Sequence, residues 1–277
     1  MHTITLLMDH NTELFDIILK NNISEKINFS KLNNEEYEIS SETPDFLKLK
    51  ISEILTEYIL INHEYSLIKN IVFSDYLYLS LNEKNEILEK AYNLITTNEN
   101  EFLKMLIVLK RRFLIKQSIL EVLNENDTIN IKGFINFRLN EYKKMLSELV
   151  EKVIKDYRIQ KEYKEFIAML KFFVDTQEKR SNRLHIIFEE TGKYTILDEF
   201  NKNITEECFE EFNETKEKNH LSNEDLLISA LITLAPKKVF IHFNTENYNQ
   251  KILKTIKQIF ENKVFIDENT PILELVR

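Results

Sequence analysis

The chain has 277 residues, of which 43% are hydrophobic and 30% charged, so its composition is that of a folded globular protein and excludes wholesale disorder. It contains two glycines, Gly133 and Gly192, and three prolines. Phosphate-binding loops need several glycines in one short stretch, because only a backbone without Cβ approaches a pyrophosphate closely enough. The Rossmann, Walker A and kinase glycine-rich motifs are therefore excluded, and a large all-β fold, whose turns need Gly and Pro, is disfavoured.

The number of cysteines and the length of the apolar stretches indicate where in the cell the protein is expected. The single cysteine, Cys208, excludes an internal disulfide and a zinc ribbon. The N-terminus lacks the basic region of a signal peptide. The longest nearly apolar stretch, at residues 226–235, is half of the about 20 residues that a membrane span needs. We therefore expect a cytoplasmic protein with no membrane insertion.

The first 43 residues predict a small α/β unit. Residues 3–8 have the composition of a strand, residues 13–20 that of a helix, and residues 36–40 that of a second strand. The apolar residues of this helix are Leu14, Ile17 and Ile18. An Asn- and Ser-rich passage over residues 21–34 separates the helix from the second strand, so a β-α-β unit and a loose tail both fit the pattern.

Residues 44–178 predict a helical bundle. Pro44 marks a helix start, since its missing N–H does no harm in a first turn. An apolar stripe runs from Leu47 through Ile61 to Val72 at spacings of three and four. Further helices are predicted over residues 82–95, 99–123, 131–157 and 161–177. Core positions are expected for Phe134 in the fourth helix of this part and for Tyr163, Phe166 and Phe173 in the fifth.

Residues 179–277 predict a C-terminal α/β unit. The runs at 184–188 and 194–197 flank Gly192 and predict a β-hairpin. Ser222 and Asp225 form a capping box for a helix that Pro236 ends. A strand, a helix and a strand at 238–243, 249–260 and 263–267 predict a parallel pair with a crossover helix. The fold class is α+β, predominantly α, and we expect the three parts (1–43, 44–178 and 179–277) to pack as one compact body.

The net charge of −9 is unevenly distributed along the chain. Residues 104–164 contain 14 Lys and Arg against 8 Asp and Glu, whereas residues 189–225 contain 4 against 12. We call residues 104–164 the basic middle. Its side chains that could contact nucleic acid or another anion are Lys110, Arg111, Arg112, Lys116, Lys143 and Lys144. The simpler interpretation is that the basic middle and the acidic region pair within one molecule.

Arg138 lies within the apolar stripe of the predicted helix 131–157, so we expect its stem to be partly buried and its guanidinium to have a partner. Glu162 and Glu165 of the next predicted helix are candidates if the two helices pack antiparallel. Such a pair would fix the helix register more than it would add stability.

No catalytic or cofactor motif is found in the sequence. His185 and His242 fall in predicted strands and would approach each other if these strands share a sheet, but a structural role is commoner for such histidines than metal binding. Cys208 lies among four glutamates, which disfavour a reactive thiolate. We therefore expect no cofactor, no metal and no enzymatic activity.

Three segments of the sequence resemble the YtxC family of sporulation proteins of endospore-forming Firmicutes. They are residues 133–142, residues 161–177 and residues 225–242, and the resemblance spans about residues 99–267 in the same order. The family implies a role associated with sporulation, no assigned activity and no catalytic residues to carry over. We expect a protein that acts through contacts with a protein partner. The alternatives are a nucleic-acid-binding accessory that uses residues 104–164 and, third, an enzyme without a recognisable motif.

Overall fold

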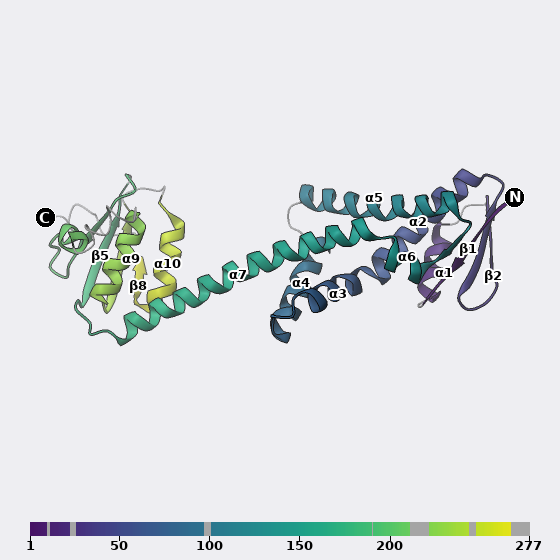
Figure 1. The fold of residues 1–277 in the computed structure, drawn as a ribbon. Coiled ribbons are helices and arrows are strands. Elements are labelled where there is room, and N and C mark those ends of the chain that lie inside the picture. Colours follow the sequence, from purple (N-terminus) through teal and green to yellow (C-terminus); the bar gives the residue numbers. More distant parts are fainter. Residues whose placement is uncertain are drawn as a thin grey trace. The chain divides into compact units, whose positions relative to one another are not determined.

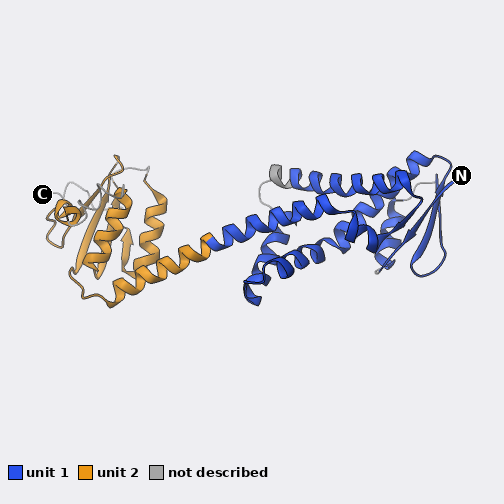
Figure 2. Cartoon of the chain, in the orientation of Figure 1, with its two compact units in different colours: residues 1–158 blue, residues 159–277 orange. Residues whose placement is uncertain are grey.

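A computed structural model of the chain describes residues 1–9, 12–22, 26–96, 101–189, 191–210, 222–243 and 248–266 (Figure 1). The contacts divide the chain into two compact units, residues 1–158 and residues 159–277 (Figure 2). This division differs from the predicted boundaries at residues 43 and 178. The expectation that the parts form one compact body stays a prediction.

Unit 1 combines a small sheet and several helices. The strand order is β2-β3-β1-β4, with β1 antiparallel to β3 and parallel to β4. The elements in chain order are β1 (His2–Leu7), α1 (Thr12–Asn22), β2 (Ile27–Lys31), β3 (Glu36–Ser41), α2 (Pro44–Asn62), α3 (Glu64–Asp75), α4 (Leu81–Thr96), α5 (Glu101–Glu125), β4 (Thr128–Asn130), α6 (Ile131–Phe137) and the first part of α7 (Asn140–Thr176).

One hydrophobic core explains why the first 43 residues do not form a unit of their own. Ile4 of β1 and Ile39 of β3 are fully buried in the same cluster as Leu47 and Ile51 of α2. The two strands that the sequence analysis missed carry weak local signals. Only the first of the five residues of β2 is buried, and β4 is three residues long and pairs with the distant β1.

The predicted helices 131–157 and 161–177 are wrong in their boundaries. The first of them, α6, ends at Phe137, and Arg138 is its C-cap. Gly133 lies in its first turn, and the backbone N–H of Gly133 donates a hydrogen bond to the Asn130 side chain. The helix α7 then continues to Thr176 without interruption. The polar stretch near residue 160 contains no Gly or Pro to end a helix, and all side chains from 158 to 166 are exposed.

Unit 2 contains a four-stranded sheet with the order β6-β5-β7-β8. The end of α7, α9 and α10 share its hydrophobic core, with Leu170, Leu227 and Ile252 packed among strand residues. The remaining elements are β5 (Arg183–Phe188), β6 (Tyr194–Leu197), α9 (Asn223–Leu234), β7 (Lys238–Phe243), α10 (Gln250–Phe260), the 3₁₀ turn η1 (Glu261–Lys263) and β8 (Val264–Ile266).

The local predictions for unit 2 are confirmed. The strands β5 and β6 form an antiparallel hairpin, and Gly192 has the positive φ of 73° that its turn requires. Ser222 and Asp225 form the capping box of α9. The strands β7 and β8 are parallel and α10 connects them. The predicted loop over 201–219 lies partly outside the described residues, which stop at 210 and resume at 222.

Among the residues that the structure describes, no helix combines the length and the apolar character needed to cross a bilayer.

The burial of Phe134 gives a test of the core of unit 1. Its side chain is buried in this core, whereas Phe137, one turn later in α6, is 75% exposed. We expect Phe134→Ala to lower the free energy of unfolding by about 3–5 kcal/mol in urea denaturation, because it leaves a cavity. The control Phe137→Ala should change it by about 0.5 kcal/mol or less. Equal effects of the two substitutions would contradict the placement of α6.

Candidate functional site

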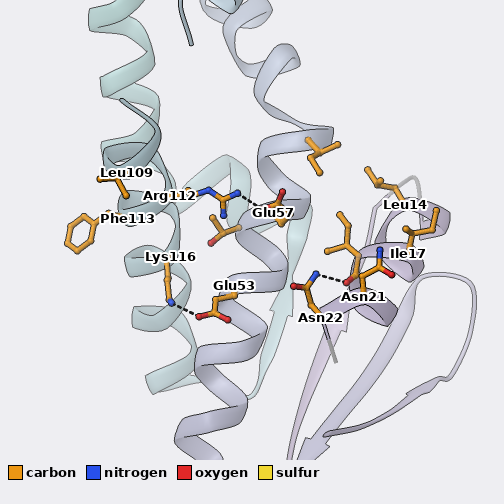
Figure 3. Close-up of a pocket in the computed structure, with 13 residues that line it drawn as sticks. Leu14, Ile17, Asn21, Asn22, Glu53, Glu57, Leu109, Arg112, Phe113 and Lys116 are labelled. Atoms are coloured by element: carbon orange, nitrogen blue, oxygen red, sulfur yellow. Dashed lines mark hydrogen bonds and ion pairs between the residues drawn. The ribbon is translucent and has the colours of Figure 1, made fainter. Parts of the chain in front are cut away.

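A groove of about 910 Å³ lies between α1, α2 and α5 of unit 1 (Figure 3). Its walls are mainly apolar and come from Leu14, Ile17 and Ile18 of α1, Ile61 of α2, and Leu109 and Phe113 of α5. At one end Asn21 and Asn22 add amide groups, and the Asn22 side chain donates a hydrogen bond to the carbonyl oxygen of Ile18 at 2.9 Å. The groove is open to solvent along the helices.

The groove exists because α5 is apolar on two faces. Its inner face buries Ile115, Ile119 and Leu123 in the core of unit 1. Its outer face exposes Met105, Leu106, Leu109 and Phe113, and the Phe113 side chain is 63% exposed. Ile17 and Ile61, which follow the apolar spacing of their helices, are both more than half exposed at the groove. The sequence analysis missed this surface because helical spacing shows which residues share a face, not whether a partner covers that face.

Two ion pairs cross the groove between α2 and α5. Lys116 Nζ lies 3.0 Å from Glu53 Oε1, and Arg112 Nη2 lies 2.5 Å from Glu57 Oε2 (Figure 3). Glu53 also accepts a hydrogen bond from Lys50, and this bond, together with the one from Lys116, lowers the pKa of its carboxyl group despite partial burial. The four charged side chains that line the groove therefore neutralise one another.

A third ion pair, between α3 and α5, is buried. Glu64, at the start of α3, is only 3% exposed and accepts hydrogen bonds from Arg111 Nη1 at 2.6 Å and from the Tyr142 hydroxyl. Burial, and then the negative charge of Glu64, raise the pKa of Tyr142 well above its usual range. The phenol therefore stays protonated and donates to the carboxylate.

The predicted anion-contact residues lie on two helices, α5 and α7, and differ in their partners. Arg111, Arg112 and Lys116 have partners on α2 and α3. The pairing of the basic middle with residues 189–225 stays a prediction. Lys143 donates a hydrogen bond to the carbonyl oxygen of Asn136 at 2.8 Å, and burial lowers its pKa. Lys110 and Lys144 are exposed.

The predicted contact of Arg138 with Glu162 and Glu165 is wrong. Both glutamates lie on α7, the helix that begins directly after Arg138, so there is no second helix to pack antiparallel to it. All three side chains are exposed. Arg138 instead caps α6, and its backbone N–H bonds to the carbonyl oxygen of Phe134.

The two strand histidines meet, as the sequence analysis considered. In unit 2, His185 Nδ1 lies 2.9 Å from His242 Nε2, both side chains are buried, and the His185 ring stacks on Phe240. Within the described part of the chain, no group of three or more His, Cys, Asp or Glu side chains is placed to hold a metal ion. Cys208 borders a separate hollow of about 190 Å³ with Arg180.

The buried ion pair predicts that two glutamates, Glu64 and Glu57, differ strongly in what they contribute to the free energy of unfolding. Glu64→Ala leaves the Arg111 guanidinium buried without its carboxylate and should cost about 3–5 kcal/mol of stability. The matched change Glu57→Ala breaks an exposed pair and should cost at most about 1 kcal/mol. Urea denaturation followed by circular dichroism measures both. Similar costs for the two variants would contradict the burial of Glu64.

Tyr142 makes the stability of unit 1 sensitive to alkaline pH. The pKa of Tyr142 is higher in the folded state than in the unfolded chain, where a tyrosine has a pKa of about 10. Below that pH the stability contributed by this group is fully present, and it is lost as the pH rises further, because the unfolded chain then loses the proton more readily than the folded one. We therefore expect the free energy of unfolding to fall above about pH 10 and to fall less steeply in Tyr142→Phe. Tyr78→Phe, which changes an exposed ring, should follow the wild-type curve. A Tyr142→Phe curve parallel to that of the wild type would refute this role.

Comparisons with known proteins agree with the resemblance noted in the sequence. A family model described as the YtxC-like family matches residues 49–265. The chain is similar to a protein of Bacillus subtilis (strain 168) called "Uncharacterized protein YtxC", with 26% identity over 264 residues that cover 93% of this chain and 87% of the relative. No solved structure matches the chain. Since the family model covers most of its length, including the walls that α2 and α5 give to the groove, the chain belongs to the YtxC-like family.

Proposed function

We propose that this protein acts by binding a protein partner in the groove between α1, α2 and α5, without catalysing a reaction. The observation that carries the proposal is the exposed apolar side chains along the groove, chiefly Ile17, Ile61, Leu109 and Phe113. Single exposed apolar residues are ordinary on a protein surface, whereas a group of them around one hollow is typical of an interaction site. Burying these side chains against a partner would remove apolar area from water, which is the main driving force of association.

The charges of the groove favour a protein over an anionic ligand. Arg112 and Lys116 already bind Glu57 and Glu53, so a phosphate would have to break these pairs or share their cations. A partner that is apolar at its centre leaves both pairs at the margin of the interface, where polar groups are common.

The alternative of nucleic-acid binding receives less support from the same residues. Of the six predicted contacts, Lys110 and Lys144 are exposed, while Arg111, Arg112, Lys116 and Lys143 donate to acceptors within unit 1. Each phosphate contact requires a cation that can release a counterion. The basic middle is therefore better explained as a set of contacts that join helices.

The cellular setting is part of the proposal. The resemblance of the three segments at residues 133–142, 161–177 and 225–242 to sporulation proteins supports a role in sporulating cells, and we place the protein in the cytoplasm. The partner would then be a protein present during spore formation.

Photo-crosslinking in sporulating cells tests the proposed function. A benzoyl-phenylalanine at position 113 should form a discrete adduct with protein, because this ring lies at the wall of the groove. The same probe at position 137, which is exposed on α6 away from the groove residues, is the matched control. Adducts to RNA or DNA instead would favour the alternative. Equal yields at both positions, or no adduct at 113, would refute the groove as a binding site.

A further inference from the structure

Unit 1 also contains a polar hollow of about 190 Å³, which shares no lining residue with the groove. Most of its lining is polar, whereas the walls of the groove are mainly apolar. The polar residues that line it are Asp9, His63, Ser66, Asn70, Lys132 and Asn136. Polar groups that converge on one hollow orient and select a small ligand, so we asked what this hollow would bind.

The parallel pairing of β1 with β4 brings distant parts of the chain to this hollow. The pairing matches Leu7 with Asn130, which are the last residues of the two strands. Asp9 and Lys132 each lie two residues beyond this pair, so both follow the carboxyl ends of adjacent parallel strands. In α/β sheets, the carboxyl ends of the strands are the edge at which ligands bind.

The helices α3 and α6 each give one face to the polar hollow. On α3 the lining residues follow the N-cap His63 at i+3, i+4 and i+7, which is the spacing of one helix face. On α6 they start at Lys132 and continue at i+3 and i+4. The apolar members are Leu67, which is half-buried, and Ile135, which is buried, and both pack in the core of unit 1. The core therefore anchors both helices at the hollow itself.

Asp9 and His63 are the least exposed polar residues of the lining, with side chains that are 15% and 16% exposed. His63 Nε2 lies 3.7 Å from Asp9 Oδ1 and 3.2 Å from Asn62 Nδ2. The His63 ring also packs edge-on against the fully buried ring of Tyr58. These contacts fix the imidazole. A carboxylate has about four acceptor sites, so the histidine leaves Asp9 able to accept further donors.

The other polar side chains of the hollow have no partner in the described part of the protein. They are exposed and form no hydrogen bond or ion pair with any residue that the structure describes; they are those of Ser66, Asn70, Lys132 and Asn136. In the described structure Lys132 also forms no ion pair with Asp9, although both line the same hollow. Both cations of the groove, by contrast, are paired. The polar hollow therefore offers an unpaired cation, a carboxylate, a hydroxyl and two amides.

The size and the charges of the polar hollow define the class of ligand. Its volume of about 190 Å³ is below the roughly 300–1,000 Å³ of sites for drug-sized ligands, so a nucleotide or a peptide is too large. A simple anion that binds Lys132 would meet the carboxylate of Asp9, and a simple cation that binds Asp9 would meet Lys132. A ligand that carries both charges satisfies both side chains. A short apolar part of it would lie against Leu67 and Ile135.

We propose that the polar hollow binds a free α-amino acid, with the carboxylate group at Lys132 and the ammonium group at Asp9. The amides of Asn70 and Asn136 both donate and accept hydrogen bonds, so they serve either group of the ligand. The inference is independent of the proposed function, because the hollow and the groove share no residue.

Isothermal titration calorimetry of the full-length chain with each of the common amino acids tests this inference. We expect at least one of them to bind at one site per chain. Lys132→Met and Asp9→Asn should each weaken this binding about tenfold or more, because each removes a charge that pairs with the ligand. Lys144→Met, which removes an exposed lysine outside the hollow, is the matched control and should leave the affinity unchanged. Circular dichroism confirms that each variant is folded.

Blocked forms of the same amino acid separate a site for both charges from a site for a simple ion. The N-acetyl derivative and the α-amide each lack one charge, so each should bind about tenfold more weakly or worse. Equal affinity for either derivative, for acetate or for inorganic phosphate would overturn the inference. The absence of binding by every amino acid at about 10 mM, or an affinity that Lys132→Met and Asp9→Asn leave unchanged, would also overturn it.

Discussion

The carboxylate of Glu64 is buried, and the helices of unit 1 are arranged around the need to match its charge. A buried ion without partners costs several kcal/mol, so Arg111 of α5 and Tyr142 of α7 must both reach it. This requirement ties three helices together at one point. It also fixes the rotation of α5, because Arg111 has to point inward while Arg112, the next residue, points toward α2.

The groove follows from that fixed register. With α5 held at Arg111, the residues Arg112 and Lys116, one turn apart, lie opposite Glu57 and Glu53 of α2. The ion pairs join the two helices on one side, and the outer side of α5 is left with Leu109 and Phe113. Arg111, Arg112 and Lys116 of the basic cluster therefore form contacts within unit 1. The walls of the groove that remain for recognition are mainly apolar.

The sequence could predict those parts of the fold that depend on neighbouring residues. Gly192 in a hairpin turn, the capping box at Ser222 and the helix start at Pro44 are local, and all three are confirmed. The strand β4 and the partners of Arg111 depend on pairing over tens of residues, which no local pattern carries. The candidate site was missed for a related reason: Ile17 and Ile61 follow the apolar spacing of their helices, yet both side chains are more than half exposed at the groove.

Two helices, α5 and α7, expose apolar side chains in addition to those that they bury. Scattered apolar residues on a surface carry no information, but those of α5 and α7 follow helical spacing and flank a groove or a core. Each exposed face loses about 25 cal/mol per Å² relative to burial. A protein partner that covers the exposed side chains of α5 at the groove would remove this loss there, because it takes their apolar area out of water.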